Sequence, residues 1–239
     1  DLDIHCGGID NAFPHHTNEI AQSESYLGHK WCNYWFHVHH LNTDTGKMSK
    51  SKGEFLTVSL LESKGYDPMA YRLFCLQSHY RRNLVFSWEN LDNAVVAYEK
   101  LIAKIAALKQ DGEVDAAMLD TLKERFVNAL NGDLNTSVAV TAVYDVLKAK
   151  TNDATKLAAL VDFDQVLSLN LIEAAEALRK KEAEEAAAAT DPEIDALVQA
   201  RTDAKKSKNY AEADRIRDVL KARGIEIIDT PQGAKWRSI

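Results

Sequence analysis

The spacing of apolar residues changes twice along the chain. Residues 1–43 contain short apolar runs typical of strands, and residues 58–180 carry apolar positions three or four apart, as on one face of a helix. Residues 191–239 mix the two patterns. We therefore expect an α/β beginning, a mainly α-helical middle that forms a bundle, and a small α/β end.

Two strands and one helix are predicted in the first part. Leu2–His5 is an apolar run that leads into two glycines, as where a parallel strand ends beside a ligand. Pro14–Leu27 predicts a helix, because proline suits the first turn and Gly28 is a suitable terminator. Trp31–Leu41 is aromatic and β-branched enough to predict the second strand.

Helical periodicity continues from Val58. Asp67 is a suitable N-cap with proline at the next position, and Ser87–Asn90 resembles a capping box. The predicted helices are 58–62, 69–77, 88–110, 116–130, 136–150 and 163–177. Apolar stripes such as that of Leu119, Leu122 and Phe126 indicate a bundle core and not a cofactor site.

The end of the chain differs in composition from the bundle. Residues 180–190 are rich in alanine and glutamate and are predicted to be a linker that is partly helical. Helices are expected at 194–207 and 210–223, followed by a strand at 225–228 and a turn. Trp236 suits two roles equally, a stacking platform for a base or a member of a small core.

Charge and cysteine content narrow the class of protein. The 239 residues carry a net charge of −7, but residues 201–239 hold ten Lys/Arg against six Asp/Glu, which favours contact with RNA at that end. Three cysteines without C-x-x-C spacing indicate a reducing, cytoplasmic compartment. No apolar run reaches the about 20 residues of a membrane span, so neither membrane insertion nor secretion is expected. The chain starts inside an apparent strand, so we expect a preceding segment.

Two short segments contain side chains suited to bind a phosphate or a metal ion. The segment Gly46–Gly53 holds three lysines and two serines between glycines, which suits an anion such as phosphate. A solvated lysine loop explains it equally well, and the spacing is not that of a P-loop. His15 and Glu19, four residues apart on a helix, have suitable geometry for two metal ligands. By itself, this spacing fits an exposed His–Glu pair better.

Three motifs together carry a family resemblance. Lys47–Ser51 reads KMSKS and resembles the signature of class I aminoacyl-tRNA synthetases. Together with Gly7–Asp10 and Phe13–Glu19, it resembles the cysteinyl-tRNA synthetase family over nearly the whole chain. The resemblance implies the second half of a Rossmann-type catalytic domain at 1–55, a stem-contact fold at 56–95, a helical bundle at 96–180 and an anticodon-binding domain at 191–239.

The resemblance also implies roles for individual residues in the catalytic part. Gly7, Gly8 and Asp10 would lie against the adenosine of ATP, and Lys47 and Lys50 would stabilise the departing pyrophosphate. His15 and Glu19 match two zinc ligands of the family, and the remaining ligands are expected upstream of this chain. His5 and His16 resemble histidines near the floor of the substrate pocket. A structural role, in which neighbouring polar groups satisfy the packed rings, explains them about as well as a catalytic role. Zinc favours the cysteine thiol over the serine hydroxyl, so no editing site is needed.

RNA contacts are implied in two places. Arg81 and Arg82 are expected near phosphates of the acceptor stem, although plain surface arginines are almost as plausible. The positions that match the family's anticodon-binding domain are Lys205, Tyr210, Asp214 and Asp229. Lysine and tyrosine stand where the bacterial pattern has arginine and tryptophan, and lysine does not reproduce a planar bidentate contact.

The resemblance implies a monomer that joins L-cysteine to tRNA(Cys) using ATP and Mg²⁺, with one zinc ion per subunit. This chain alone is expected to be inactive, because half of the nucleotide fold and two zinc ligands are missing from it. A ligase of the same lineage that joins cysteine to an amino sugar is one alternative. A non-catalytic tRNA-binding fragment is the other.

Overall fold

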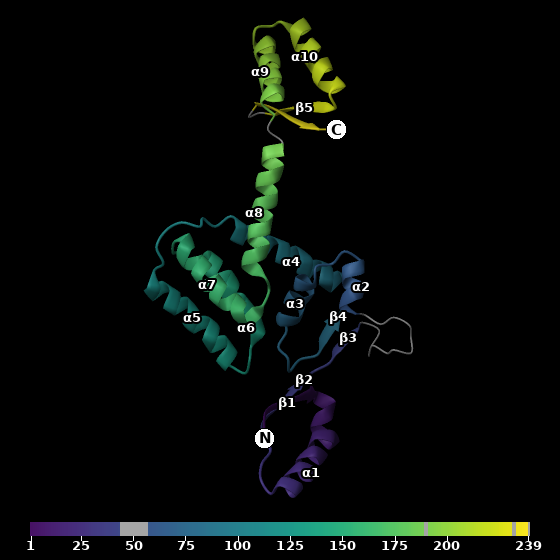
Figure 1. Ribbon diagram of the computed structural model, residues 1–239, viewed down its shortest axis with the longest axis vertical. Helices are drawn as coiled ribbons and strands as arrows, with labels where there is room; N and C mark the ends of the chain where they lie inside the picture. Colours follow the sequence, from purple (N-terminus) through teal and green to yellow (C-terminus); the bar gives the residue numbers. More distant parts are fainter. Residues whose placement is uncertain (44–56, 189–190, 231–232, 239) are drawn as a thin grey trace. The chain divides into compact units, whose positions relative to one another are not determined.

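The computed structural model describes the chain except residues 44–56, 189–190, 231–232 and 239 (Figure 1). It divides into two compact units, residues 1–176 and 177–239. Lys47 and Lys50, which the sequence places in catalysis, lie outside the described residues. Among the described helices, none combines the length and the apolar character that crossing a membrane requires.

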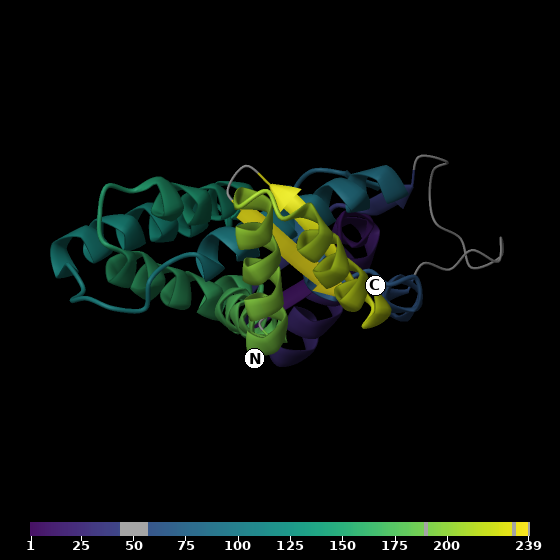
Figure 2. The same ribbon diagram turned by 90° about the horizontal axis from the view of Figure 1, so that it is seen from above.

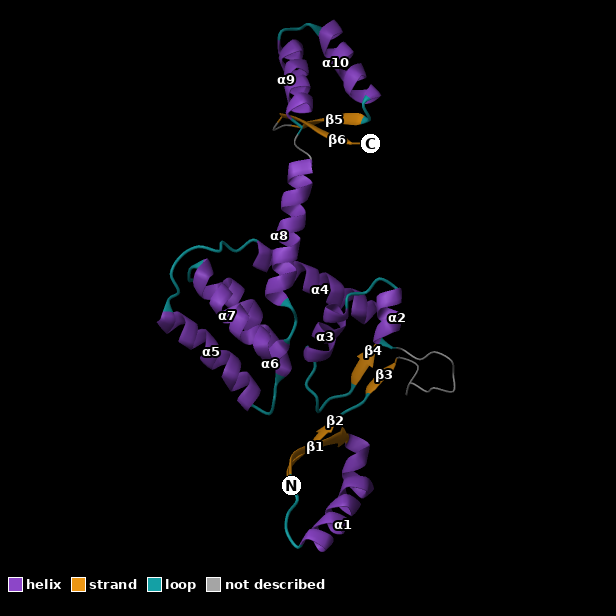
Figure 3. Cartoon of the chain, viewed as in Figure 1, coloured by secondary structure: helices purple, strands orange, loops and turns teal. Residues whose placement is uncertain are grey.

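The chain begins with a parallel βαβ unit. Strands β1 (Leu2–Gly8) and β2 (Cys32–Val38) pair in parallel, and helix α1 (Thr17–Leu27) connects them (Figure 3). Parallel strands need such a crossover because a tight turn cannot join them. Gly28 ends α1 in the left-handed conformation at φ 75°, as predicted.

The start of α1 differs from the prediction. The α-helix begins at Thr17 and not at Pro14, because Phe13 is extended at φ −144° and ψ 134°. Two short turns, η1 (Ile9–Asn11) and η2 (Ala12–His16), connect β1 to the helix. His15 and His16 are the last residues of η2 and immediately precede α1.

The second predicted strand is two strands. β2 ends at Val38, and β3 (Leu41–Thr43) pairs in parallel with β4 (Leu84–Phe86), a strand that the sequence did not indicate. The break occurs because the backbone changes partners: the His39 N–H donates to the Tyr80 carbonyl at 2.9 Å. The single strand predicted over residues 31–41 is therefore wrong at its C-terminal end.

Three capped helices follow. α2 (Val58–Ser63), α3 (Pro68–Leu76) and α4 (Trp88–Ala106) each begin at a side chain that accepts a backbone N–H, and Asp67 and Ser87 have the predicted capping roles. Their core cluster consists of Leu61, Phe74, Phe86, Leu91 and Ala94. β3 packs against this cluster through Leu41. The segment that follows β2 is thus anchored on helices.

The bundle continues with α5 (Ala116–Asn131), α6 (Thr136–Lys148) and α7 (Asp153–Leu167). The helix predicted at 163–177 is wrong, because α7 ends there and α8 (Leu171–Ala188) begins. Ser168 adopts φ 50°, and the Asp164 carboxylate accepts the N–H groups of Leu169 and Leu171 at 2.6 and 2.7 Å, which separates the two helices. α8 is helical up to Ala188, so most of the predicted linker is helix.

The unit at 177–239 has its own core. Helices α9 (Pro192–Lys206) and α10 (Tyr210–Ala222) pack on each other and on the antiparallel strands β5 (Ile225–Thr230) and β6 (Gly233–Ser238) (Figure 2). The core cluster consists of Ile194, Val198, Ile216, Leu220 and Ile225, and Trp236 packs against it. The structure places Trp236 in this core.

Candidate functional site

One carboxylate lies between two imidazoles at the start of the chain. His5 Nε2 lies 2.9 Å from Glu19 Oε2, and His15 Nε2 lies 2.9 Å from Glu19 Oε1. β1 positions His5, and the first turn of α1 positions Glu19, where the helix dipole favours a negative charge. The predicted pair His15 and Glu19 is therefore in contact, and His5 joins it.

A buried histidine completes this group. His16 is 3% exposed, and its Nδ1 lies 2.8 Å from Nε2 of His37 on β2. Its ring also lies 4.7 Å from that of His5. Burial lowers the pKa of His16, and the nearby His5 and His37 lower it further. His16 is therefore held as a neutral imidazole, the form that donates an electron pair to a metal.

The group of His5, His16 and Glu19 fits a metal ion. One ligand atom from each lies within 4.8 Å of the others. Glu19 Oε2 is buried and accepts no hydrogen bond from the described residues, although His5 Nε2 is 2.9 Å away. A buried carboxylate oxygen is costly unless a donor or a cation compensates it, and both the neighbouring His5 and a bound cation are suited to do so. Nitrogen and carboxylate ligands suit Zn²⁺. His15, with a side chain 64% exposed, lies at the rim of the group.

Aromatic rings line the histidine group. His5 lies opposite Trp35 in the β1–β2 register, and their ring centroids are 4.9 Å apart. Trp31 packs against Trp35 at 5.7 Å, and the indole nitrogen of Trp31 is buried without a hydrogen-bond partner among the described residues. The sequence did not indicate Trp31, Trp35 or His37 as pocket residues. Side chains two apart on a strand share a face, so Trp35 and His37 lie on one face of β2. Only the pairing of β2 with β1 places that face against His5.

Two glycines allow the backbone to approach this group closely. A Cβ at Gly7 would lie 2.7 Å from the ring carbon Cε1 of His16, and a Cβ at Gly8 would lie 2.4 Å from Asp10 Oδ1. Side chains at these positions would therefore displace His16 or Asp10. Asp10 Oδ1 also lies 3.3 Å from His40 Nε2, and both side chains are exposed. An exposed carboxylate beside a glycine turn is suited to accept hydrogen bonds from a ribose.

The two arginines predicted to contact RNA differ in their surroundings. Arg81 makes a bidentate ion pair with Asp133, with Nε 2.5 Å from Oδ2 and a second nitrogen 3.1 Å from Oδ1. Its pKa is raised by this hydrogen bonding. Arg82 is exposed to solvent beside it. The structure thus gives Arg81 a protein partner, and phosphate contact by either arginine stays a prediction.

The candidate RNA-binding residues of the other unit lie on its helices. Lys205 on α9 and Tyr210 at the start of α10 are exposed, and the tyrosine is 62% exposed. Asp214 pairs with Arg217 at 3.1 Å one turn later. Asp229 belongs to β5, and its side chain lies outside the described part of the chain. Tyr210 therefore presents a free ring face suited to stacking.

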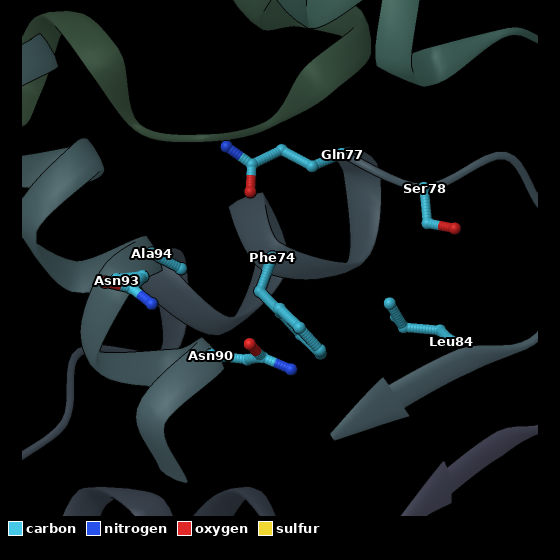
Figure 4. Close-up of a pocket in the computed structure, with 7 residues that line it drawn as sticks. All are labelled: Phe74, Gln77, Ser78, Leu84, Asn90, Asn93 and Ala94. Atoms are coloured by element: carbon cyan, nitrogen blue, oxygen red, sulfur yellow. The ribbon is translucent and has the colours of Figure 1, made fainter. Parts of the chain in front are cut away.

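A separate hollow of about 360 Å³ lies between α3, β4 and α4 (Figure 4). Its lining residues are Phe74, Gln77, Ser78, Leu84, Asn90, Asn93 and Ala94. This lining has amides, a hydroxyl and apolar groups but no charged side chain. None of the residues predicted from the sequence to act in catalysis or binding lines it.

Comparison with known proteins assigns both ends of the chain to families. Residues 1–96 match the catalytic domain of class I (C) tRNA synthetases, and residues 187–237 match the anticodon-binding domain of cysteinyl-tRNA ligases. The chain is 38% identical to the cysteine–tRNA ligase of Brevibacillus brevis, over 99% of this chain and 53% of that protein. It is 41% identical to that of Novosphingobium aromaticivorans, over 99% of this chain and 50% of that protein.

The chain thus spans about half the length of the curated relatives it matches. Among solved structures, it resembles the leucyl-tRNA synthetase of Agrobacterium radiobacter K84, solved in a ternary complex with tRNA and LeuAMS. The TM-score is 0.53 at 17% identity, over 74% of this chain and 27% of that one. This likeness indicates a shared class I synthetase fold.

Proposed function

Because this chain belongs to the cysteinyl-tRNA synthetase family, we propose that it supplies the second half of a cysteine–tRNA ligase. The reaction is the ATP-dependent activation of L-cysteine to cysteinyl-adenylate, followed by transfer to tRNA(Cys). The observation that carries the proposal is the histidine group around Glu19. The Glu19 carboxylate oxygens lie 2.9 Å from His15, the other proposed zinc ligand, and 2.9 Å from His5, a proposed floor residue.

His5, His15, His16 and Glu19 are the candidate residues that hold zinc and shape the substrate pocket. His15 and Glu19 are the proposed ligands, with the remaining ligands supplied from outside this chain, and His5 and His16 form the floor. What a bound zinc ion supplies is a soft Lewis acid that prefers the thiol of cysteine to the hydroxyl of serine. The chain's own contribution is to keep His16 neutral by burial and to exclude water with Trp31 and Trp35.

ATP would bind beside the glycine turn. Gly7 and Gly8 permit close approach of the backbone, and Asp10 is proposed to accept hydrogen bonds from the ribose. The cysteine carboxylate attacks the α-phosphorus of ATP with Mg²⁺ bound, and pyrophosphate leaves. Lys47 and Lys50 are proposed to neutralise the charge that develops on the departing phosphate oxygens. The carboxylate is already ionised, so this step requires no general base.

The remaining segments are proposed to bind the tRNA. We assign residues 1–55 to the second half of the Rossmann-type domain, 56–95 to a stem-contact fold with Arg81 and Arg82, and 96–180 to the helical bundle. Residues 191–239 form the anticodon-binding domain, with Lys205, Tyr210, Asp214 and Asp229 as candidate contacts. We propose a cytoplasmic monomer. The anticodon-domain match favours this function over ligation of cysteine to an amino sugar, which requires no RNA-binding unit.

The test is complementation in trans. The N-terminal half of a related cysteine–tRNA ligase is produced with this chain, and cysteine-dependent exchange between ATP and pyrophosphate is measured. We expect exchange with cysteine, little with serine, and none with either half alone. Exchange by this chain alone would refute the division of the site. A complemented pair that binds tRNA(Cys) but never forms cysteinyl-tRNA would support the non-catalytic alternative.

A further inference from the structure

Asp133 lies at a junction of three chain segments. It belongs to the turn between α5 and α6, at φ 64°, and the next residue, Leu134, has φ 51°. Non-glycine residues in this left-handed region cost free energy and persist only where surrounding contacts hold them. Backbone hydrogen bonds within the turn contribute, and the side-chain contacts to Asp133 come from residues 79–81. The Tyr80 hydroxyl donates to Oδ1 at 2.5 Å, Arg81 binds in a bidentate manner, and His79 Nε2 is 3.8 Å away.

Tyr80 connects this turn to β2. Its ring stacks on Phe36 of β2, with centroids 4.4 Å apart and planes at 29°. Its carbonyl accepts the N–H of His39 at 2.9 Å, at the point where β2 ends. Arg81 also lies over the Tyr80 ring, 5.0 Å from its centroid. Asp133 therefore holds both the hydroxyl of Tyr80 and the guanidinium that covers its ring.

The opposite face of β2 lies against the histidine group. Successive side chains of a strand point to opposite faces, so Phe36 and His37 face away from each other. His37 contacts His16 at 2.8 Å. The same short strand is thus held on one face by Tyr80 and on the other by His16.

We propose that Asp133 is a positioning residue, which fixes β2 through Tyr80 and thereby fixes the contact of His37 with His16. This inference deepens the proposed function and rests on it for what the positioned pocket does. It links the helical bundle to the substrate pocket through a series of contacts: Asp133 to Tyr80, Tyr80 to Phe36, and His37 to His16. Asp133, Tyr80 and Phe36 need not touch the substrate.

The test uses the whole chain and two local measurements. Imidazole nitrogen signals of His16 and His37 are recorded by NMR and assigned through their change in His37→Gln, and amide hydrogen exchange is followed at His39. We expect Asp133→Asn and Tyr80→Phe to displace or broaden the two imidazole signals. Exchange at His39 should accelerate by about 10- to 100-fold, which is the size of one lost hydrogen bond to a charged group.

Asp145→Asn is the matched control. It removes the Arg125–Asp145 ion pair, at 3.1 Å, from the same two helices of the bundle, and within the described part of the chain Asp145 makes no hydrogen bond or ion pair with β2. Asp133→Asn spectra that match those of Asp145→Asn would overturn the proposal, even if both variants were less stable. Unchanged imidazole signals in Tyr80→Phe would also overturn the proposal, because the effect of Asp133 on β2 would then not depend on the Tyr80 hydroxyl. These measurements need no catalysis, so failure of complementation leaves them valid.

Discussion

Trp236 donates its indole N–H to a carboxylate oxygen of Asp195 at 2.7 Å and so joins β6 to the first turn of α9. The ring packs against the core cluster of residues 177–239. Because the indole nitrogen is hydrogen-bonded and the ring packs on the core, Trp236 contributes mainly to the stability of this unit. Of the two roles that the sequence left open for Trp236, the structure supports membership of the core.

Trp236→Phe should loosen this unit. The phenyl ring keeps most of the packing but loses the hydrogen bond, so the local free energy of unfolding should fall by about 1 kcal/mol. Hydrogen exchange in α9 and α10 measures this loss, and Trp88→Phe, in the other unit, should leave that exchange unchanged. If RNA affinity fell while exchange in α9 stayed at the wild-type rate, Trp236 would be a stacking residue after all.

Glu19→Gln should weaken zinc binding. The amide keeps the shape of the side chain but removes the charge that faces His5 and His15, so we expect at least about a tenfold loss of affinity. Competition with a chromophoric chelator measures this on the chain complemented with the N-terminal half, which supplies the remaining ligands. Glu24→Gln, on the same helix, is the control for charge alone. Equal losses in both variants would argue against a specific metal site.

The free energy of unfolding should depend on pH through the ionisation of Asp133. Hydrogen bonds from Arg81 and Tyr80 lower the pKa of Asp133 from 3.8 to about 2. The native state therefore favours the ionised form, and the stabilisation is fully present above pH 3.8 and lost as the pH falls toward 2. Urea unfolding of the wild type and Asp133→Asn should show a stability difference at pH 5 that shrinks by pH 2.5. A difference that stays constant would contradict this.

Tyr210→Ala should reduce RNA binding. The ring is 62% exposed, and stacking of a base on such a ring contributes about 1–3 kcal/mol. Fluorescence polarisation with a labelled tRNA(Cys) transcript should show at least about a fivefold weaker affinity. Tyr26→Ala, which removes an exposed tyrosine of α1, is the control. Lys205→Ala should instead lower the dependence of affinity on salt, because it removes a charge and not a ring.

Local sequence patterns determined much of this protein. Asp67 and Ser87 cap the helices that they were predicted to cap, and Gly28 ends α1, because each effect depends on backbone groups within a few residues. The three family motifs were enough to identify the family, since they are short segments with fixed chemistry. The errors at residues 38–41 and 168–171 arose where another group redirected the backbone. The Tyr80 carbonyl accepts the N–H of His39, and the Asp164 carboxylate accepts the N–H of Leu169.

Only the tertiary structure decided which side chains meet. The spacing of His15 and Glu19 was visible in the sequence, but the contacts of His5 with Glu19 and of His37 with His16 require β1 and β2 to pair in register across α1. The junction of Asp133 with Tyr80 joins residues 53 positions apart. Such contacts are set by packing between segments distant in the chain, and the periodicity of one segment carries no information about the partner it will find.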